Sequence, residues 1–328
     1  MCRTGRCRLR PESYGPDVAH RGNDAPFAVP DSFREMPRFW DGGDRQWLDG
    51  LPATVAGRLK LWHLELDGEV RHGSNAIAVP VCRGGDQLVL RVTAPQRWPG
   101  FDREAAALAF WAGRGTVRLL DADADDAAML LERLAMDGTL ADVPLDRAVP
   151  VIGHLMRRLA VESPGSSVPS TAGTVARRAL ELEPAWDRLG RPFTRSLLDR
   201  TRRIAVRLAQ STSDLPVNGD LHFDQVLRGT REPWLAVDPV LLRGDIEYDL
   251  ARVLWTRIHE MPGAADVRRH FGTLVTVAGL DRERARDWVV FRAVDYWLWG
   301  LDHGLTTDPE RCRRLVAAFP SGPVRDEG

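Results

Sequence analysis

Apolar and polar residues follow two different periods along the chain, and the change comes near residue 134. Between residues 61 and 134, apolar residues form short runs separated by turn residues. These runs predict strands at 61–66, 75–81, 87–92, 117–120 and 128–131. Residues 102–113 carry apolar side chains at helical spacing and predict one helix. Strands surrounding a single helix are typical of an α+β lobe built on an antiparallel sheet.

Beyond residue 140 the apolar positions recur at helical spacing. The predicted helices are 145–161, 174–189, 192–210, 247–260, 264–278, 281–302 and 308–319. A mixed segment, residues 216–241, interrupts them with turns and two apolar runs. Residues 1–28 have almost no apolar periodicity and predict a disordered tail. We therefore expect a tail at 1–28, a sheet lobe at 29–134 and a mainly helical lobe at 135–328.

Composition narrows the class of protein. The 328 residues carry 45 basic and 46 acidic side chains, for a formal net charge of −1, which lacks the clearly basic character of a nucleic-acid binder. No apolar run approaches the roughly 18 residues that a membrane-spanning helix needs. The four cysteines have no zinc-type spacing and favour a reduced, cytoplasmic protein. Lys60 is the only lysine, so a site that ordinarily uses lysine must use arginine or do without.

The candidate chemistry lies in the mixed segment. Asp220 and Gln225 stand five residues apart in a polar loop, and Asp238 follows a returning apolar run. A carboxylate can orient or deprotonate an attacking hydroxyl, while an amide oxygen and a second carboxylate can hold Mg²⁺ on nucleotide phosphates. This arrangement suits phosphoryl transfer, in which the placement of charge does most of the catalysis.

Several motifs around these positions resemble the aminoglycoside phosphotransferase family, which has a protein-kinase-like two-lobe fold. The similarity is greatest to its streptomycin 6-kinase and hydroxyurea phosphotransferase group, and it runs from about Val29 to about Leu305. The most specific motifs are WLDGLP at 47–52, TVRLLD at 116–121, LLERL at 130–134, GDLH at 219–222, EPWLAVDP at 232–239, and GD with YDL within 244–250. Several ordered motifs are a stronger signal than any one of them alone.

The resemblance implies a role for individual residues. Asp220 would be the catalytic base and Asp238 a magnesium ligand, with Gln225 at the position of the second metal ligand. The implied nucleotide-binding residues are the covering loop Gly73, Ser74 and Asn75, then Arg91 at the position of the phosphate-contacting lysine, Glu104 as its helix partner, and Glu132 and Leu134 in the adenine hinge. The acceptor side would carry Asp245, Glu247 and Asp302.

Three positions depart from the family pattern. Asn218 stands where the family usually has His, Gln225 replaces Asn, and Arg91 replaces Lys, although each keeps the charge or donor class of the usual residue. We therefore predict a kinase that uses ATP and Mg²⁺ to phosphorylate a hydroxyl of a small, polar, cationic molecule. Aminoglycosides of the streptomycin type are the leading acceptors, with antibiotic resistance as the role. A biosynthetic kinase of another metabolite and a nucleotide-binding pseudokinase stay open, as does the choice between monomer and homodimer.

Overall fold

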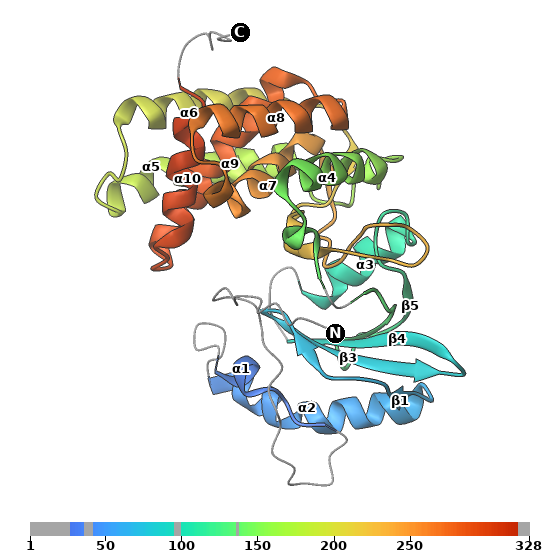
Figure 1. The fold of residues 1–328 in the computed structure, drawn as a ribbon. Helices are drawn as coiled ribbons and strands as arrows, with labels where there is room; N and C mark the ends of the chain where they lie inside the picture. The colour runs from blue at the N-terminus through green and yellow to red at the C-terminus, as the bar shows by residue number, and fades with distance from the viewer. Residues whose placement is uncertain (1–26, 36–41, 95–99, 136–137, 321–328) are drawn as a thin grey trace, which may run out of the picture. The chain divides into compact units, whose positions relative to one another are not determined.

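The computed structural model describes residues 27–35, 42–94, 100–135 and 138–320 (Figure 1). Most of the predicted tail at 1–28 therefore lies outside the described residues. Internal contacts divide the chain into two units, the first comprising the residues up to Asp102 together with Leu119–Arg133, and the second comprising Arg103–Arg118 and the residues from Leu134 onward. Residues 103–118 thus group with the second unit, whereas the sequence pattern assigned them to the first lobe.

The first unit contains an antiparallel sheet, as predicted. Its strands are β1 (Glu65–Leu66), β2 (Arg71–His72), β3 (Ala76–Arg83), β4 (Asp86–Thr93), β5 (Leu119–Asp123) and β6 (Ala128–Glu132). They follow the order β1-β3-β4-β6-β5, and β2 also pairs with β3. The β3–β4 hairpin turns at Gly84 and Gly85, whose φ angles of 59° and 93° suit glycine.

A 20-residue helix, α2 (Gly42–Leu61), runs along one face of this sheet (Figure 1). Its buried residues Leu48, Leu51 and Val55 share a core with apolar residues of β3, β4 and β6. The sequence prediction did not include this helix and began a strand at Leu61, where the structure has the end of α2. The short helix α1 (Asp31–Arg34) buries Phe33 in the same core.

The second unit is mainly helical, as predicted. Its helices are α3 (Phe101–Trp111, whose first two residues belong to the first unit), α4 (Leu145–Leu159), α5 (Thr171–Arg188), α6 (Arg195–Ala209), α7 (Leu250–Thr256), α8 (Ala264–Ala278), α9 (Arg282–Asp302) and α10 (Thr307–Ala317). One apolar core, containing the fully buried Trp255 and Trp288, joins these helices. None of the described helices combines the length and apolar character needed to cross a membrane.

Two short strand pairs interrupt the helices and carry the polar loop. Strands β7 (Leu215–Val217) and β10 (Leu242–Gly244) pair antiparallel. Strands β8 (Val226–Leu227) and β9 (Leu235–Ala236) form a second antiparallel pair. The polar loop containing Asp220 leads from β7 to β8, so both of its ends are held by strand pairing.

Candidate active site

The loop after β7 is shaped by close backbone packing. The side-chain oxygen of Asn218 accepts a hydrogen bond from the backbone N–H of Asp220 at 3.2 Å. Gly219 has a φ of 83°, and a Cβ at this position would lie 2.6 Å from the carbonyl oxygen of Val240. The N–H of Val240 in turn donates to the carbonyl of Asn218 at 2.8 Å. Only glycine can pack this closely against Val240. The packing fixes the backbone that carries the Asp220 side chain.

The β8–β9 pair brings Gln225 next to the segment that carries Asp238. The pairing aligns Val226 with Ala236, and one step further the N–H of Val237 donates to the carbonyl oxygen of Gln225 at 2.8 Å. Asp238 follows directly with a φ of 55°, an uncommon backbone conformation for a residue other than glycine. Residues 13 positions apart in the sequence thereby become neighbours in space.

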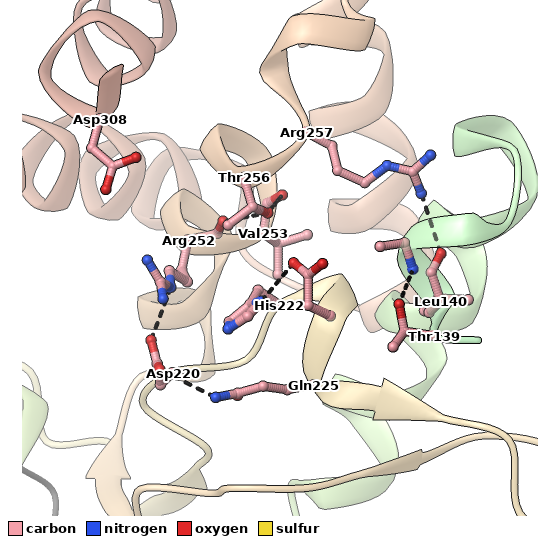
Figure 2. Close-up of polar contacts among 12 residues, drawn as sticks. Thr139, Leu140, Asp220, His222, Gln225, Arg252, Val253, Thr256, Arg257 and Asp308 are labelled. Atoms are coloured by element: carbon pink, nitrogen blue, oxygen red, sulfur yellow. Dashed lines mark hydrogen bonds and ion pairs between the residues drawn. The ribbon is translucent and has the colours of Figure 1, made fainter. Parts of the chain in front are cut away.

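The Asp220 carboxylate contacts a different side chain at each oxygen (Figure 2). Oδ1 lies 2.9 Å from Nε of Arg252, which projects from α7. Oδ2 accepts a longer hydrogen bond, 3.4 Å, from the Gln225 side-chain amide. About a third of the Asp220 side chain remains exposed, with a relative accessibility of 35%. The carboxylate is therefore oriented by the protein and still reachable by a small molecule.

A second carboxylate, that of Asp249, holds the backbone of the loop. Asp249 is buried, and its Oδ2 accepts a hydrogen bond from the N–H of Gly219 at 3.3 Å. Burial raises the pKa of Asp249 to about 7, against the lowering influence of Arg292 and of the Gly219 hydrogen bond. Asp249 therefore helps to fix the loop without reaching solvent.

His222 lies in the same loop, and its ring contacts the side chain of Asp224. Its Nδ1 lies 3.2 Å from Oδ2 of Asp224, and the Asp224 side chain is exposed. Hydrogen bonding to His222 lowers the pKa of Asp224 from its ordinary value, although desolvation by the neighbouring atoms opposes the shift. His222 therefore pairs locally with an exposed acid of the same loop.

The donor atoms near Asp220 fit a magnesium ion bound together with phosphates. Oε1 of Gln225 is buried and has no hydrogen-bond partner among the described residues. An amide oxygen without a partner offers lone pairs of the hard oxygen type that Mg²⁺ prefers. The described parts of the chain contain no cluster of three or more His, Cys, Asp or Glu side chains that could hold a metal alone. A metal here would thus use few protein ligands and complete its shell with phosphate and water, as is usual for Mg²⁺.

In the first unit, the residues expected to cover the nucleotide form a turn between β2 and β3. The N–H of Gly73 donates to the carbonyl of Ala76 at 3.0 Å, and the carbonyl of Asn75 accepts from Ala94 at 2.7 Å, with Ser74 between them. Arg91 lies on β4, where its side chain is largely buried, in register with Ala78 of β3. The turn is therefore held at both of its ends by backbone hydrogen bonds.

The other expected nucleotide-binding residues lie on two different units. Glu132 ends β6 in the first unit, in register with Leu88 of β4. Glu104 on α3 and Leu134 are both buried in the second unit. Their roles toward the nucleotide stay predictions.

The comparison with protein families decides the identity of the chain. The model of the aminoglycoside/hydroxyurea antibiotic resistance kinases matches residues 61–304. The chain belongs to this family. It is 38% identical to a streptomycin 6-kinase from Streptomyces griseus, over 85% of this chain and 92% of the relative. It is 34% identical to a hydroxyurea phosphotransferase from Kitasatospora aureofaciens, over 84% of this chain and 80% of the relative.

Solved structures confirm the fold expected of this kinase family. The choline kinase LicA from Streptococcus pneumoniae superposes with a TM-score of 0.59 at 12% identity, covering 83% of this chain and 99% of that chain. The aminoglycoside phosphotransferase APH(4)-Ia gives a TM-score of 0.57 at 16% identity, over 82% and 99%. These structures confirm the prediction of a protein-kinase-like α+β fold, and the family match with its streptomycin 6-kinase relatives confirms a kinase that phosphorylates a hydroxyl.

Two of the three expected acceptor residues of this kinase lie in the protein interior. Asp245 is 1% exposed, and its oxygens accept hydrogen bonds from Ser211 at 2.6 Å and from the Trp288 indole at 2.9 Å. Glu247 is also buried, accepts a bond from the N–H of Asp281, and has a pKa raised by burial. Both carboxylates connect η3 (Ile246–Asp249) and its flank to other segments. The structure thus corrects the prediction that they face the acceptor.

Asp302 of this kinase has a different setting. It is partly exposed, pairs with Arg188 at 3.2 Å, and lines a cavity of about 310 Å³ between α5 and α9. The cavity is also lined by Trp299 and by the ion pair of Arg178 with Asp295, whose atoms approach to 2.7 Å. Acids, arginines and one aromatic ring thus surround the space.

The sequence interpretation assigned no role to Arg252, although it is the cationic neighbour of the expected base. With 45 basic residues and a single lysine, the kinase has 44 arginines, so composition does not distinguish this one. The usable signal is its position three residues after Asp249, in the helix that the YDL motif begins. That spacing is one helical turn, so it favours a residue on the same side as the loop.

Proposed function

We propose that this kinase transfers the γ-phosphoryl group of ATP to a hydroxyl of an aminoglycoside-like, streptomycin-type acceptor and thereby confers resistance. The observation that carries the proposal is the convergence of Asp220, Gln225 and the Asp238 segment through the β8–β9 pair. The names of the relatives supply the acceptor class. We expect the reaction to occur in the cytoplasm, because two free cysteines among the described residues, Cys82 and Cys312, suit a reducing compartment.

Asp220 acts on the acceptor hydroxyl. Its Oδ2 accepts the hydroxyl hydrogen bond and orients the attacking oxygen toward the γ-phosphorus. As the new P–O bond forms and the bond to the β-phosphate oxygen breaks, the hydroxyl proton passes to Asp220 and ADP leaves. The protein contributes mainly position and charge, because phosphoryl transfer requires little covalent chemistry from it.

Gln225 and Asp238 would hold Mg²⁺. Their side chains offer an amide oxygen with no hydrogen-bond partner in the described part of the chain and a carboxylate on the adjoining segment. Mg²⁺ bound there would neutralise charge on the nucleotide phosphates. The remaining assignments follow the family pattern, with Gly73, Ser74, Asn75 and Arg91 on the phosphates, Glu104 as partner of Arg91, and Glu132 with Leu134 at the adenine.

The acceptor would lie against the cavity between α5 and α9. Asp295, Asp302 and Glu181 line this space, where they pair with Arg178 and Arg188. A guanidinium of the acceptor would compete for these carboxylates through charge-assisted hydrogen bonds. Trp299 is 38% exposed, and its ring is stacked on Tyr296 and His303, so it contributes apolar surface beside these carboxylates. These features favour a cationic acceptor. Hydroxyurea is the second candidate, since one relative at 34% identity is a hydroxyurea phosphotransferase.

The test is a transfer assay with radiolabelled ATP, Mg²⁺ and either streptomycin or hydroxyurea, analysed for labelled acceptor. Labelled streptomycin that depends on both Mg²⁺ and the protein supports the proposal. Labelled hydroxyurea alone would change the acceptor, and transfer only to another metabolite would make this a biosynthetic kinase. Nucleotide binding without turnover on any acceptor would identify a pseudokinase and contradict the proposal.

A further inference from the structure

We propose that Arg252 is the positioning residue of the catalytic base, and that it holds Oδ1 of Asp220 so that Oδ2 is presented to the acceptor hydroxyl. The inference rests on the proposed phosphotransfer and adds a residue to its machinery. Arg252 Nε lies 2.9 Å from Oδ1, whereas the contact of Oδ2 with Gln225 is 3.4 Å. Oδ1 therefore forms a close ion pair with Arg252, whereas Oδ2 accepts a long hydrogen bond from Gln225.

The Arg252 side chain is itself held by aromatic rings. Its guanidinium carbon lies 5.8 Å from the ring centre of Trp255 and 5.9 Å from that of Tyr296. These two rings are stacked, with centres 4.7 Å apart and planes inclined by 6°. A guanidinium at such distances gains cation–π attraction, so the rings restrict where it can lie.

An acid on α10 completes the support. The Tyr296 hydroxyl donates to Oδ2 of Asp308 at 3.1 Å. Burial alone would lower the pKa of Arg252, but Asp220, Tyr296 and Asp308 together raise it. The guanidinium is thus a fixed positive charge supported by residues of α9 and α10, and Figure 2 shows it directed at Asp220.

This arrangement has a specific consequence for the reaction. The terminal torsion of an aspartate is broad by itself, so an ion pair at one oxygen narrows the directions that the other oxygen can take. Attack on phosphorus requires the hydroxyl in line with the leaving group, and an error of about 1 Å can cost on the order of 10²-fold in rate. Arg252 therefore acts through Asp220, without contacting acceptor or nucleotide.

The experiment compares Arg252→Met, Arg252→Lys and a control, Arg207→Met, in the full chain. Arg207 forms a 2.7 Å ion pair with Asp287 on α9, and its loss removes a more exposed arginine–carboxylate pair from the same unit. The assay measures kcat and the KM for ATP with streptomycin or hydroxyurea, whichever the wild type phosphorylates. Thermal melting tests that each variant is folded.

We expect Arg252→Met to lower kcat about 10- to 100-fold while the KM for ATP stays within about threefold. Arg252→Lys should be intermediate, because it keeps the charge without the planar guanidinium. Arg207→Met should keep kcat within about twofold. Should Arg252→Met not fold, Arg252→Lys carries the test, and a lowered kcat at unchanged KM for ATP supports positioning.

Wild-type kcat in a folded Arg252→Met protein, or in Arg252→Lys when that variant carries the test, overturns the assignment. A parallel loss of kcat and melting temperature in all three variants also overturns it, since that pattern indicates a structural role. If the wild-type protein phosphorylates no acceptor, the proposed function fails first, and the assignment of Arg252 fails with it. The two failures are therefore distinguished by the wild-type assay.

Discussion

At the scale of single residues, the Asp220 carboxylate combines a fixed orientation with an exposed edge. Because removal of a general base typically costs 10²- to 10⁴-fold, we expect Asp220→Ala to lower kcat by about that factor. The nucleotide is held by other residues in the proposal, so its affinity should stay within a few-fold of wild type. Steady-state transfer and nucleotide titration measure the two effects.

The neighbouring Asp224 provides the control for Asp220. Its side chain is exposed and pairs with His222, so Asp224→Asn should keep kcat within about twofold. Wild-type turnover in Asp220→Ala would show that Asp220 is not the base. A loss of equal size in both variants would instead indicate that any acid removed from this loop disrupts it.

Gln225 is the residue through which the metal assignment is tested. Gln225→Asn shortens the side chain by about 1–1.5 Å and supplies the amide that the family normally uses. We therefore expect kcat to be kept or raised and the Mg²⁺ concentration at half-maximal rate to change little. Gln225→Leu keeps the size but removes the lone pairs, so the Mg²⁺ requirement should rise. Measurement of the rate against Mg²⁺ concentration separates the variants, and complete inactivity of Gln225→Asn would show a pocket built around the longer side chain.

Sequence reasoning brought together those candidate residues whose proximity follows from the chain itself. Asp220 and Gln225 share one loop, and Asp238 follows the returning strand β9, so local order was enough to place them near one another. Asp245 and Glu247 were misassigned because acidic residues are ordinarily exposed, and only the packing of Trp288 and Asp281 around them reveals that they are buried. Burial of a charged side chain depends on distant segments and leaves no local signal.

At the scale of elements, the turn at Gly219 is where the strand pairs and the catalytic loop meet. Gly219→Ala would add a Cβ 2.6 Å from the Val240 carbonyl, on a residue whose φ is 83°. The left-handed conformation alone costs about 1–2 kcal/mol for alanine, and the contact with the backbone adds to it. We expect a lower melting temperature together with a loss of kcat, measured by thermal unfolding and the transfer assay.

Gly190→Ala is the control that separates the cost of the left-handed backbone from the cost of the contact with Val240. The φ of Gly190 is similar at 74°, but a Cβ there would meet no atom of the described residues within 4 Å. Gly190→Ala should therefore lose only the conformational part of the stability and keep its kcat. If Gly219→Ala retains full activity, or loses no more stability than Gly190→Ala, the close packing against Val240 is not needed for the loop.

The missed helix α2 shows where pattern reading fails for an element. Leu48, Leu51 and Val55 have the spacing of one helical face, and all three are buried. Pro52 and two glycines, Gly50 and Gly57, interrupt the segment and lower its intrinsic helix propensity. The helix is therefore stabilised by packing against the sheet, which a reading of local propensity does not include. The β3–β4 hairpin was found because its Gly-Gly turn is a local signal.

At the scale of the whole molecule, the contacts divide the chain close to the position at which the apolar period changes. The second unit contains the residues from Leu134 onward, and it also contains residues 103–118. The structural reason is the packing of α3, whose Trp111 indole donates to the carbonyl of Leu159 at 3.0 Å. That contact joins residues 48 positions apart. Periodicity within a helix predicts its existence but not which unit it joins.

The buried Asp249 predicts how the stability of the protein depends on pH. Its pKa is raised by burial to about 7 in the folded chain, against an ordinary value near 3.8. Between about pH 4 and pH 7 the folded state therefore holds a proton that the unfolded chain has released. The free energy of unfolding must fall as pH rises through this window. Asp249→Asn has no such proton and does not lose this stability. The melting temperature of the variant minus that of wild type should therefore increase from pH 4.5 to pH 7.5.

The control for this prediction is an acid whose pKa moves the other way. The hydrogen bond from Arg269 lowers the pKa of Asp146, so the stability it contributes is lost only as pH falls below about 4. The melting temperature of Asp146→Asn relative to wild type should therefore stay constant from pH 5 to pH 7.5. Asparagine at 249 can still accept the Gly219 hydrogen bond through its amide oxygen, which spares the loop. A constant difference for Asp249→Asn across the same range would mean that Asp249 is already ionised at pH 4.5, and that its burial is fully compensated by Arg292 and the loop N–H groups.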